Sequence, residues 1–113
     1  MMTETIPLKL TLRHSGHAAG LLEEVQRGSD RLAELHARIS RCDVLLESPS
    51  HHHRHGSQWR ARIDLTIPGK EILVDHALAE DPYSAVHQAF AIAAQKIESF
   101  RQRRLERRGG TGD

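Results

Sequence analysis

A regular helical pattern near the C-terminus places the strongest constraint on the fold. Within "DPYSAVHQAFAIAAQKIESFRQRRLERR", residues 81–108, apolar side chains recur at intervals of four and three residues. They are Val86, Phe90, Ala93, Ile97 and Phe100. This spacing puts one apolar stripe on a long α-helix, with Asp81 as a favourable N-cap and Pro82 at the first helical position. Such a helix has to bury its stripe against another element, so the chain must supply a second layer.

Four segments carry the patterns expected of strands in that layer. They are "TIPLKLTLRH" (5–14), "RCDVLLES" (41–48), "QWRARIDLTI" (58–67) and "KEILVDHAL" (70–78). The first and third alternate between apolar and polar side chains, which is typical of a half-buried strand. The last three follow one another through short connections, one of which is the turn signal Pro68-Gly69, and this predicts an antiparallel meander.

A helical spacing returns between the first two strands, over residues 14–39. The stripe consists of Leu21, Val25, Gly28, Leu32, Leu35 and Ile39. We interpret Gly28 as a point where the helix backbone approaches the sheet closely. The element order is therefore β-α-β-β-β-α, and the economical packing is an α+β two-layer sandwich with two helices on one face of a four-stranded sheet.

Length and composition limit the class of protein. A chain of 113 residues with 38% hydrophobic and 27% charged residues suits one folded domain. Cys42 is the only cysteine, which excludes an internal disulfide and fits a reducing cytoplasm. No apolar run approaches the roughly 20 residues that span a bilayer, and the N-terminus has no secretion-signal pattern. We therefore expect a cytoplasmic protein with a single domain over residues 1–108 and a disordered tail at 109–113.

Histidine is concentrated at residues 51–55, "HHHRH", within a connection rich in serine, proline and glycine. Neighbouring residues in a flexible loop cannot all aim at one ion, and the nearest acids in the sequence, Glu47 and Asp64, lie outside the loop. We favour a solvated hairpin loop over a metal site or a leftover tag, and we expect no metal and no cofactor. In the strand at 70–78, Ile72, Val74, His76 and Leu78 are expected to face the core, with His76 as a structural histidine.

No motif of catalysis is recognisable. The chain lacks a nucleophile elbow, a phosphate loop, a glycine-rich dinucleotide turn and a pair of histidines on one helix face. We therefore predict that the protein has no catalytic residues and acts by binding.

Positive charge is concentrated at the end of the last helix, although the net charge of the chain is only +1. About 26 helical residues span close to 39 Å and nine strand residues about 30 Å, so this helix should overhang the sheet by two turns. After Phe100 the apolar stripe continues as arginine. The candidate RNA-binding residues on this helix are Lys96, Arg101, Arg103, Arg104, Arg107 and Arg108, and those flanking the buried face of the first helix are Arg27, Arg31 and Arg38. Two such rows side by side would make a basic strip suited to a phosphate backbone. A solvated helix end with favourable dipole charge is the alternative.

The element order, the length and above all "DPYSAVHQAFAIAAQKI" resemble the short ribosome hibernation promoting factors and ribosome-associated inhibitor A, over roughly residues 6–108. In that family the last helix opens with Asp-x-Tyr-x-Ala-[Ile/Val], matched here by Asp81, Tyr83, Ala85 and Val86. The resemblance implies an RNA-binding fold related to double-stranded RNA-binding domains. The implied partner is the small ribosomal subunit with its rRNA, where the domain blocks the tRNA and mRNA path and stops translation in stressed or stationary cells. No cofactor is implied.

The sequence also departs from that family. His87 stands where the family usually has an acid, and Ile92 and Gln95 occupy two positions that are expected to be basic. Arg101 and Arg103 match later basic positions. The chain lacks the further C-terminal domain of long family members, so we expect a monomer that does not pair ribosomes directly. The alternatives are a divergent relative that binds another RNA or a protein partner, and a metal-binding protein that uses its histidine-rich loop.

Overall fold

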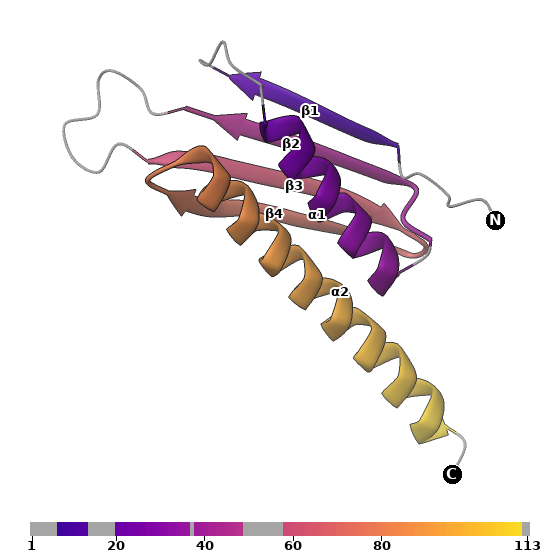
Figure 1. The fold of residues 1–113 in the computed structure, drawn as a ribbon. Coiled ribbons are helices and arrows are strands. Elements are labelled where there is room, and N and C mark those ends of the chain that lie inside the picture. Colours follow the sequence, from indigo (N-terminus) through magenta and orange to yellow (C-terminus); the bar gives the residue numbers. More distant parts are fainter. Residues whose placement is uncertain (1–6, 14–19, 37, 49–57, 112–113) are drawn as a thin grey trace.

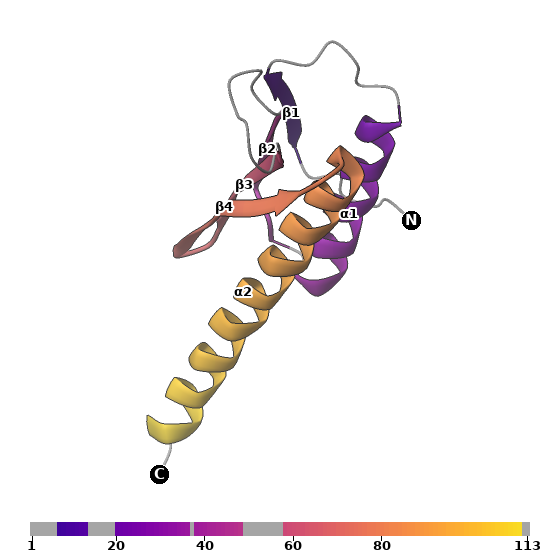
Figure 2. The ribbon, with the colours of Figure 1, turned by 90° about the vertical axis from the view of Figure 1, so that its left-hand side faces the viewer.

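Two helices cover one face of a four-stranded sheet (Figure 1). The computed structural model describes residues 7–13, 20–36, 38–48 and 58–111, the last five by their backbone only. The elements are β1 (Leu8–Arg13), α1 (Leu21–Leu35), β2 (Arg41–Glu47), β3 (Trp59–Ile67), β4 (Lys70–Ala79) and α2 (Pro82–Thr111). The strand order is β1-β2-β3-β4; β1 runs parallel to β2, and the other neighbours are antiparallel. This arrangement confirms the predicted α+β order and the placement of both helices on the same side (Figure 2).

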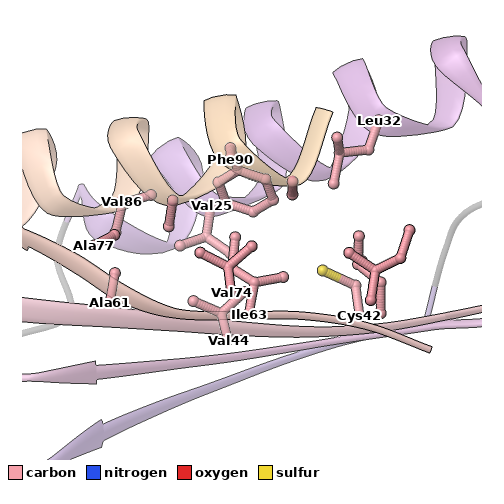
Figure 3. Close-up of a cluster of buried hydrophobic side chains, with 14 of the residues drawn as sticks. Val25, Leu32, Cys42, Val44, Ala61, Ile63, Val74, Ala77, Val86 and Phe90 are labelled. Atoms are coloured by element: carbon pink, nitrogen blue, oxygen red, sulfur yellow. The ribbon is translucent and has the colours of Figure 1, made fainter. Parts of the chain in front are cut away.

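The core fills the space between the two helices and the inner face of the sheet (Figure 3). Val25 and Phe90 point down from α1 and α2, and Val44, Ile63 and Val74 point up from three adjacent strands. Each of these side chains is at most 7% exposed. Burial of an aliphatic or aromatic side chain of this size contributes about 1.5–3 kcal/mol, so the sandwich is held mainly by this layer.

The alternation of β4 changes at a β-bulge, and this corrects the expectation for His76. Ala61 pairs with Ala77 whereas Ile63 pairs with Val74, so β4 carries one extra residue between these pairs. Because one inserted residue moves every later side chain to the opposite face, Ala77 is buried and His76 is exposed. Leu78, which was also expected to face the core, is 45% exposed. His76 is therefore not a core histidine; its Nδ1 lies 3.1 Å from Oδ1 of Asp75.

α1 is shorter than predicted at its C-terminal end. It ends at Leu35, and His36 is extended with φ −148°, while its N–H still donates to the Leu32 carbonyl. The chain leaves the helix here because it has to turn back and enter β2. Ile39 is 6% exposed and joins the core from this connection and not from the helix. Gly28 also differs from its prediction, since the element that approaches it is α2 and not the sheet.

α2 begins as predicted and ends later. Asp81 accepts the backbone N–H of Ser84 through Oδ1 at 2.8 Å and the Ser84 hydroxyl through Oδ2 at 2.7 Å. These bonds lower the pKa of Asp81 below its usual value. The helix continues through Gly109 and Gly110 to Thr111, so the first three residues of the predicted disordered tail at 109–113 are helical. Each glycine costs only about 1 kcal/mol in a helix, and an existing helix gains one hydrogen bond for every residue that it adds.

Candidate nucleic-acid interface

The C-terminal part of α2 extends past α1 and past the sheet (Figures 1 and 2). Its 30 residues correspond to about 45 Å of helix. The Leu35 carbonyl oxygen, at the end of α1, lies 3.5 Å from Nη1 of Arg101, and beyond this point no other described helix runs beside α2. The side chains of residues 101–106 are all exposed. The helix therefore presents an overhang whose residues are open to a partner.

Three arginines act electrostatically on His36, which lies directly after the end of α1. The backbone N–H of Arg38 donates to His36 Nδ1 at 3.2 Å, and Arg101 and Arg104 come from α2. Partial burial lowers the pKa of His36 below its usual value of 6.5, and the charges of Arg101, Arg38 and Arg104 lower it further. We name these four residues the α1-end cluster. Guanidinium groups bind phosphate oxygens through paired donors, so cations of this kind are chemically suited to an anionic ligand.

Arg104 connects this cluster to the turn between β3 and β4. Its guanidinium carbon lies 5.6 Å from the centroid of the Phe100 ring, which is a cation–π contact. A Cβ placed on Gly69, in the turn, would lie 3.9 Å from Nη1 of Arg104. The aromatic ring thus holds the guanidinium at the base of the overhang, within reach of the hairpin.

Two of the predicted cations already have acidic partners on their own helices. Nη1 of Arg27 lies 3.0 Å from Oε2 of Glu24, and Nη1 of Arg101 lies 3.2 Å from Oε2 of Glu98. Both are exposed pairs between residues three apart, and such pairs contribute only about 0.2–1 kcal/mol. A phosphate can therefore compete with either carboxylate for its guanidinium.

Lys96 and Arg103 lie on a different side of α2, where a groove of about 610 Å³ separates the helix from β4. Lys70 and Leu73 line the groove from β4. Nζ of Lys96 donates to the Leu73 carbonyl at 2.7 Å. We name this feature, between the β3–β4 hairpin and α2, the hairpin groove. Ile92 and Gln95 also line it and bring no charge to this side of the helix.

The seven predicted residues whose side chains the structure describes do not form one strip. Arg38, Arg101 and Arg104 influence His36 electrostatically, whereas Lys96 and Arg103 line the hairpin groove. Arg31 lines a separate apolar cleft of about 130 Å³ between α1 and α2. Arg27 lies on α1 one turn before it. Arg107 and Arg108 belong to the helical backbone of α2, and their side chains lie outside the described part of the chain.

Sequence reasoning missed two members of these sites, His36 and Lys70. His36 follows directly after the last residue of α1. Because α1 was predicted to continue for one more turn, the position of His36 at the helix end was not expected. Lys70 follows the Pro68-Gly69 turn, so its position at a hairpin tip was predictable. Its proximity to α2 was not, because that depends on how the helix crosses the sheet.

The described residues contain no group of three or more histidines, cysteines or acids that could hold a metal ion. The histidine-rich loop at 51–55 lies outside them. Burial raises the pKa of the Cys42 thiol to about 12, so this cysteine is neutral and unreactive at physiological pH. None of the helices in the described part of the chain is long and apolar enough to cross a membrane.

The fold and the exposed cationic overhang define a class of small two-layer α+β proteins with a long basic C-terminal helix. Residues 8–105 match the family described as sigma 54 modulation protein / S30EA ribosomal protein, and the chain belongs to this family. This confirms the resemblance to ribosome hibernation factors that the sequence indicated.

Two solved structures share the fold. A ribosomal subunit interface protein from Coxiella burnetii is 13% identical, with a TM-score of 0.72 over 86% of this chain and 99% of the other. The N-terminal domain of Protein Y from Thermus thermophilus is 19% identical, with a TM-score of 0.68 over 86% and 99% of the two chains. No curated protein sequence matches the chain significantly.

Proposed function

We propose that the protein docks on the small ribosomal subunit by binding the phosphates of its rRNA. In the docked state it inhibits translation or stabilises idle ribosomes during stress or stationary phase. The observation that carries this proposal is the group of exposed cations Arg101, Arg103 and Arg104 at the base of the α2 overhang. Membership of a family described as ribosomal, and a Coxiella burnetii structure described as a subunit interface protein, support a ribosomal partner.

In this proposal the protein acts by occupying its site on the ribosome, and no covalent step is needed. A rigid helix that reaches beyond a compact sandwich can enter a crevice in RNA that the sandwich itself cannot enter. Contacts between guanidinium groups and phosphates fix position and orientation, and they carry little sequence information. The protein would then act as a monomer in the cytoplasm, and it would exclude other ligands from the site that it fills.

Sedimentation with purified ribosomal particles tests this proposal. We expect the protein to migrate with 30S and 70S particles in a low-salt sucrose gradient, and not with 50S particles alone. Because phosphate binding releases counterions, the bound fraction should fall steeply as salt rises. Protein that stays at the top of the gradient with 30S particles would contradict the proposal.

A charge-reversal variant locates the contact. Arg101→Glu, Arg103→Glu and Arg104→Glu together should abolish co-sedimentation with ribosomal particles and the inhibition of translation in a cell-free assay. The thermal melt should change little, because all three side chains are exposed. A control with Lys9→Glu, Arg13→Glu and Arg62→Glu makes the same charge change at exposed strand positions. This control should still bind ribosomes.

The apolar cleft favours a second candidate, a protein partner. Gly28, Leu32, Phe90 and Ala94 line this cleft between the helices, together with Arg31. A cleft of about 130 Å³ accommodates one apolar side chain from another protein.

Binding to RNA homopolymers without ribosome binding would instead favour a different RNA as the partner.

A further inference from the structure

The hairpin groove lies between α2 and β4. In Figure 2 the β3–β4 hairpin and α1 lie on opposite sides of α2. Its volume is about 610 Å³, and none of its described lining residues belongs to α1. One wall is the beginning of β4 and the other is the middle of α2. The groove is therefore separate from the α1-end cluster, although both use side chains of the same helix.

Positive charge reaches the groove from both walls. Lys70 lines it from β4, and Lys96 and Arg103 line it from α2, while Glu71 is the only acid among the described lining residues. Arg104 reaches the hairpin turn beside it, since its Nη1 would lie 3.9 Å from a Cβ on Gly69. Several cations from two chain segments around one concave surface suit a ligand with repeated negative charges.

Both walls are fixed before any ligand binds. Ile67 pairs with Lys70, so Pro68 and Gly69 form a two-residue turn, and Gly69 adopts φ +79°, which favours glycine. The bond from Lys96 Nζ to the Leu73 carbonyl ties α2 to β4, an edge strand of the sheet. A preformed groove loses little conformational entropy when it binds a ligand.

We propose that the hairpin groove binds the sugar–phosphate backbone of a single RNA strand, with Lys70 and Arg103 contacting phosphates from opposite walls. This inference rests on the proposed function. It adds Lys70 as a contact residue and single-stranded RNA as the ligand of this groove. A concave groove with two walls can enclose one backbone. A duplex presents a convex surface that such a groove cannot enclose, although it can still contact the exposed cations of the overhang. Ile72, Leu73 and Ile92 offer apolar contact to sugars, and the described lining contains no aromatic ring for base stacking. Binding should therefore be independent of sequence.

The test compares a 12-nucleotide oligouridine with a 12-base-pair RNA duplex, using fluorescence anisotropy of the full chain between 50 and 200 mM KCl. Each phosphate contact contributes about −0.7 to the slope of log affinity against log salt for a single strand. Lys70→Ala should make the single-strand slope shallower by about 0.7 and leave the duplex slope unchanged. The double variant Lys70→Ala, Arg103→Ala should make the single-strand slope shallower by about 1.4. Lys9→Ala is the matched control, because Lys9 is exposed on β1, far from the groove in the sheet order.

Several outcomes would overturn the inference. One is an unchanged single-strand slope in Lys70→Ala; another is an equal loss of single-strand and duplex binding. Binding of polyglutamate that depends on Lys70, without binding of oligouridine, would identify an acidic protein as the occupant. The two proposals fail separately: co-sedimentation with ribosomes that does not depend on Lys70 leaves the proposed function intact and rejects this groove as an RNA site.

Discussion

Gly28 of α1 lies directly against the ring of Phe90 of α2. A Cβ placed on Gly28 would come 2.5 Å from the ring atom Cδ2 and 2.6 Å from Cγ. The ring is 7% exposed and packs within the core. This contact determines how closely the two helices approach, and therefore how close the end of α1 comes to Arg101.

Gly28→Ala is expected to destabilise the protein. The added methyl group meets rigid ring atoms, and overpacking of this kind costs about 1–3 kcal/mol. Alanine recovers up to about 1 kcal/mol because it favours the helix more than glycine does. We expect a net loss of about 1–2 kcal/mol in the free energy of unfolding, measured by urea denaturation. In a Phe90→Leu background the same substitution should cost less, because the ring is absent. Equal losses in both backgrounds would contradict this explanation.

Asp81→Ala is expected to lower the melting temperature by a few degrees. The substitution removes both acceptors for Ser84 in the first turn of α2. Asp81→Asn keeps one side-chain oxygen as an acceptor and should remain closer to the wild type. Thermal melts followed by circular dichroism at pH 7 provide the measurement. Identical melting temperatures for all three proteins would show that the cap does not contribute to stability.

The contribution of this cap should also depend on pH. Hydrogen bonds from Ser84 lower the pKa of Asp81 below its usual value of 3.8. As pH falls below 3.8, the unfolded chain binds a proton at Asp81 more readily than the folded chain does. The stabilisation therefore decreases, and it is lost once the pH has fallen through the lowered pKa of the folded state. The difference in melting temperature between wild type and Asp81→Ala should therefore be largest near neutral pH and should narrow in acid. A constant difference would mean that the carboxylate charge is not involved.

Periodicity predicted most of the fold because each element has one apolar face. It failed at β4, where Ala77 faces the core and His76, which was predicted to do so, is exposed. A β-bulge leaves no unambiguous signal in a sequence: "LVDHALA" can be divided into inward and outward residues in either register. It also failed at the end of α1, because Ile39 keeps the helical spacing although it is buried from a connection. In both places the apolar spacing alone does not determine the backbone conformation, which is a β-bulge in one case and a connection in the other.

The candidate site was predictable as a set of charges but not as an arrangement. The spacing of Arg101 and Arg104 predicted an exposed helix end, and both residues lie there. The division of the cations between the α1-end cluster and the hairpin groove depends on the crossing of α2 over the sheet. That crossing is set by contacts such as the one between Gly28 and Phe90, which connect residues distant in sequence.

Glu98→Gln is expected to strengthen binding to ribosomal particles or structured RNA. The carboxylate of Glu98 lies 3.2 Å from Arg101 and competes with phosphate for its guanidinium. An exposed pair of this kind is worth about 0.2–1 kcal/mol, so affinity should rise by up to about fivefold. Anisotropy titrations at fixed salt measure the change. Glu80→Gln makes the same charge change at an exposed residue before α2 and should have little effect. Equal gains in the two variants would indicate general electrostatics and not release of Arg101.

His36 is expected to couple RNA binding to pH. Burial, Arg101, Arg38 and Arg104 lower its pKa below 6.5, and Nδ1 already accepts the N–H of Arg38. The folded protein therefore binds fewer protons than the unfolded chain just below pH 6.5, and it should lose stability as pH falls through that range. A phosphate placed among the arginines would offset their charges and raise the pKa of His36. Binding should then take up a proton and tighten as pH falls from 7 towards 6.

His36→Asn isolates this coupling from the other histidines, because Asn lacks a titrating group and its side-chain oxygen is an acceptor that can replace Nδ1. In this variant we expect affinity for RNA to change less between pH 7 and pH 6 than in the wild type. NMR titration of the His36 ring, with and without saturating RNA, measures the pKa directly. An upward shift on binding places phosphate next to the α1-end cluster. The same pKa in free and bound protein would mean that RNA contacts the overhang without reaching His36, and the arginines around it would then serve only to stabilise the end of α1.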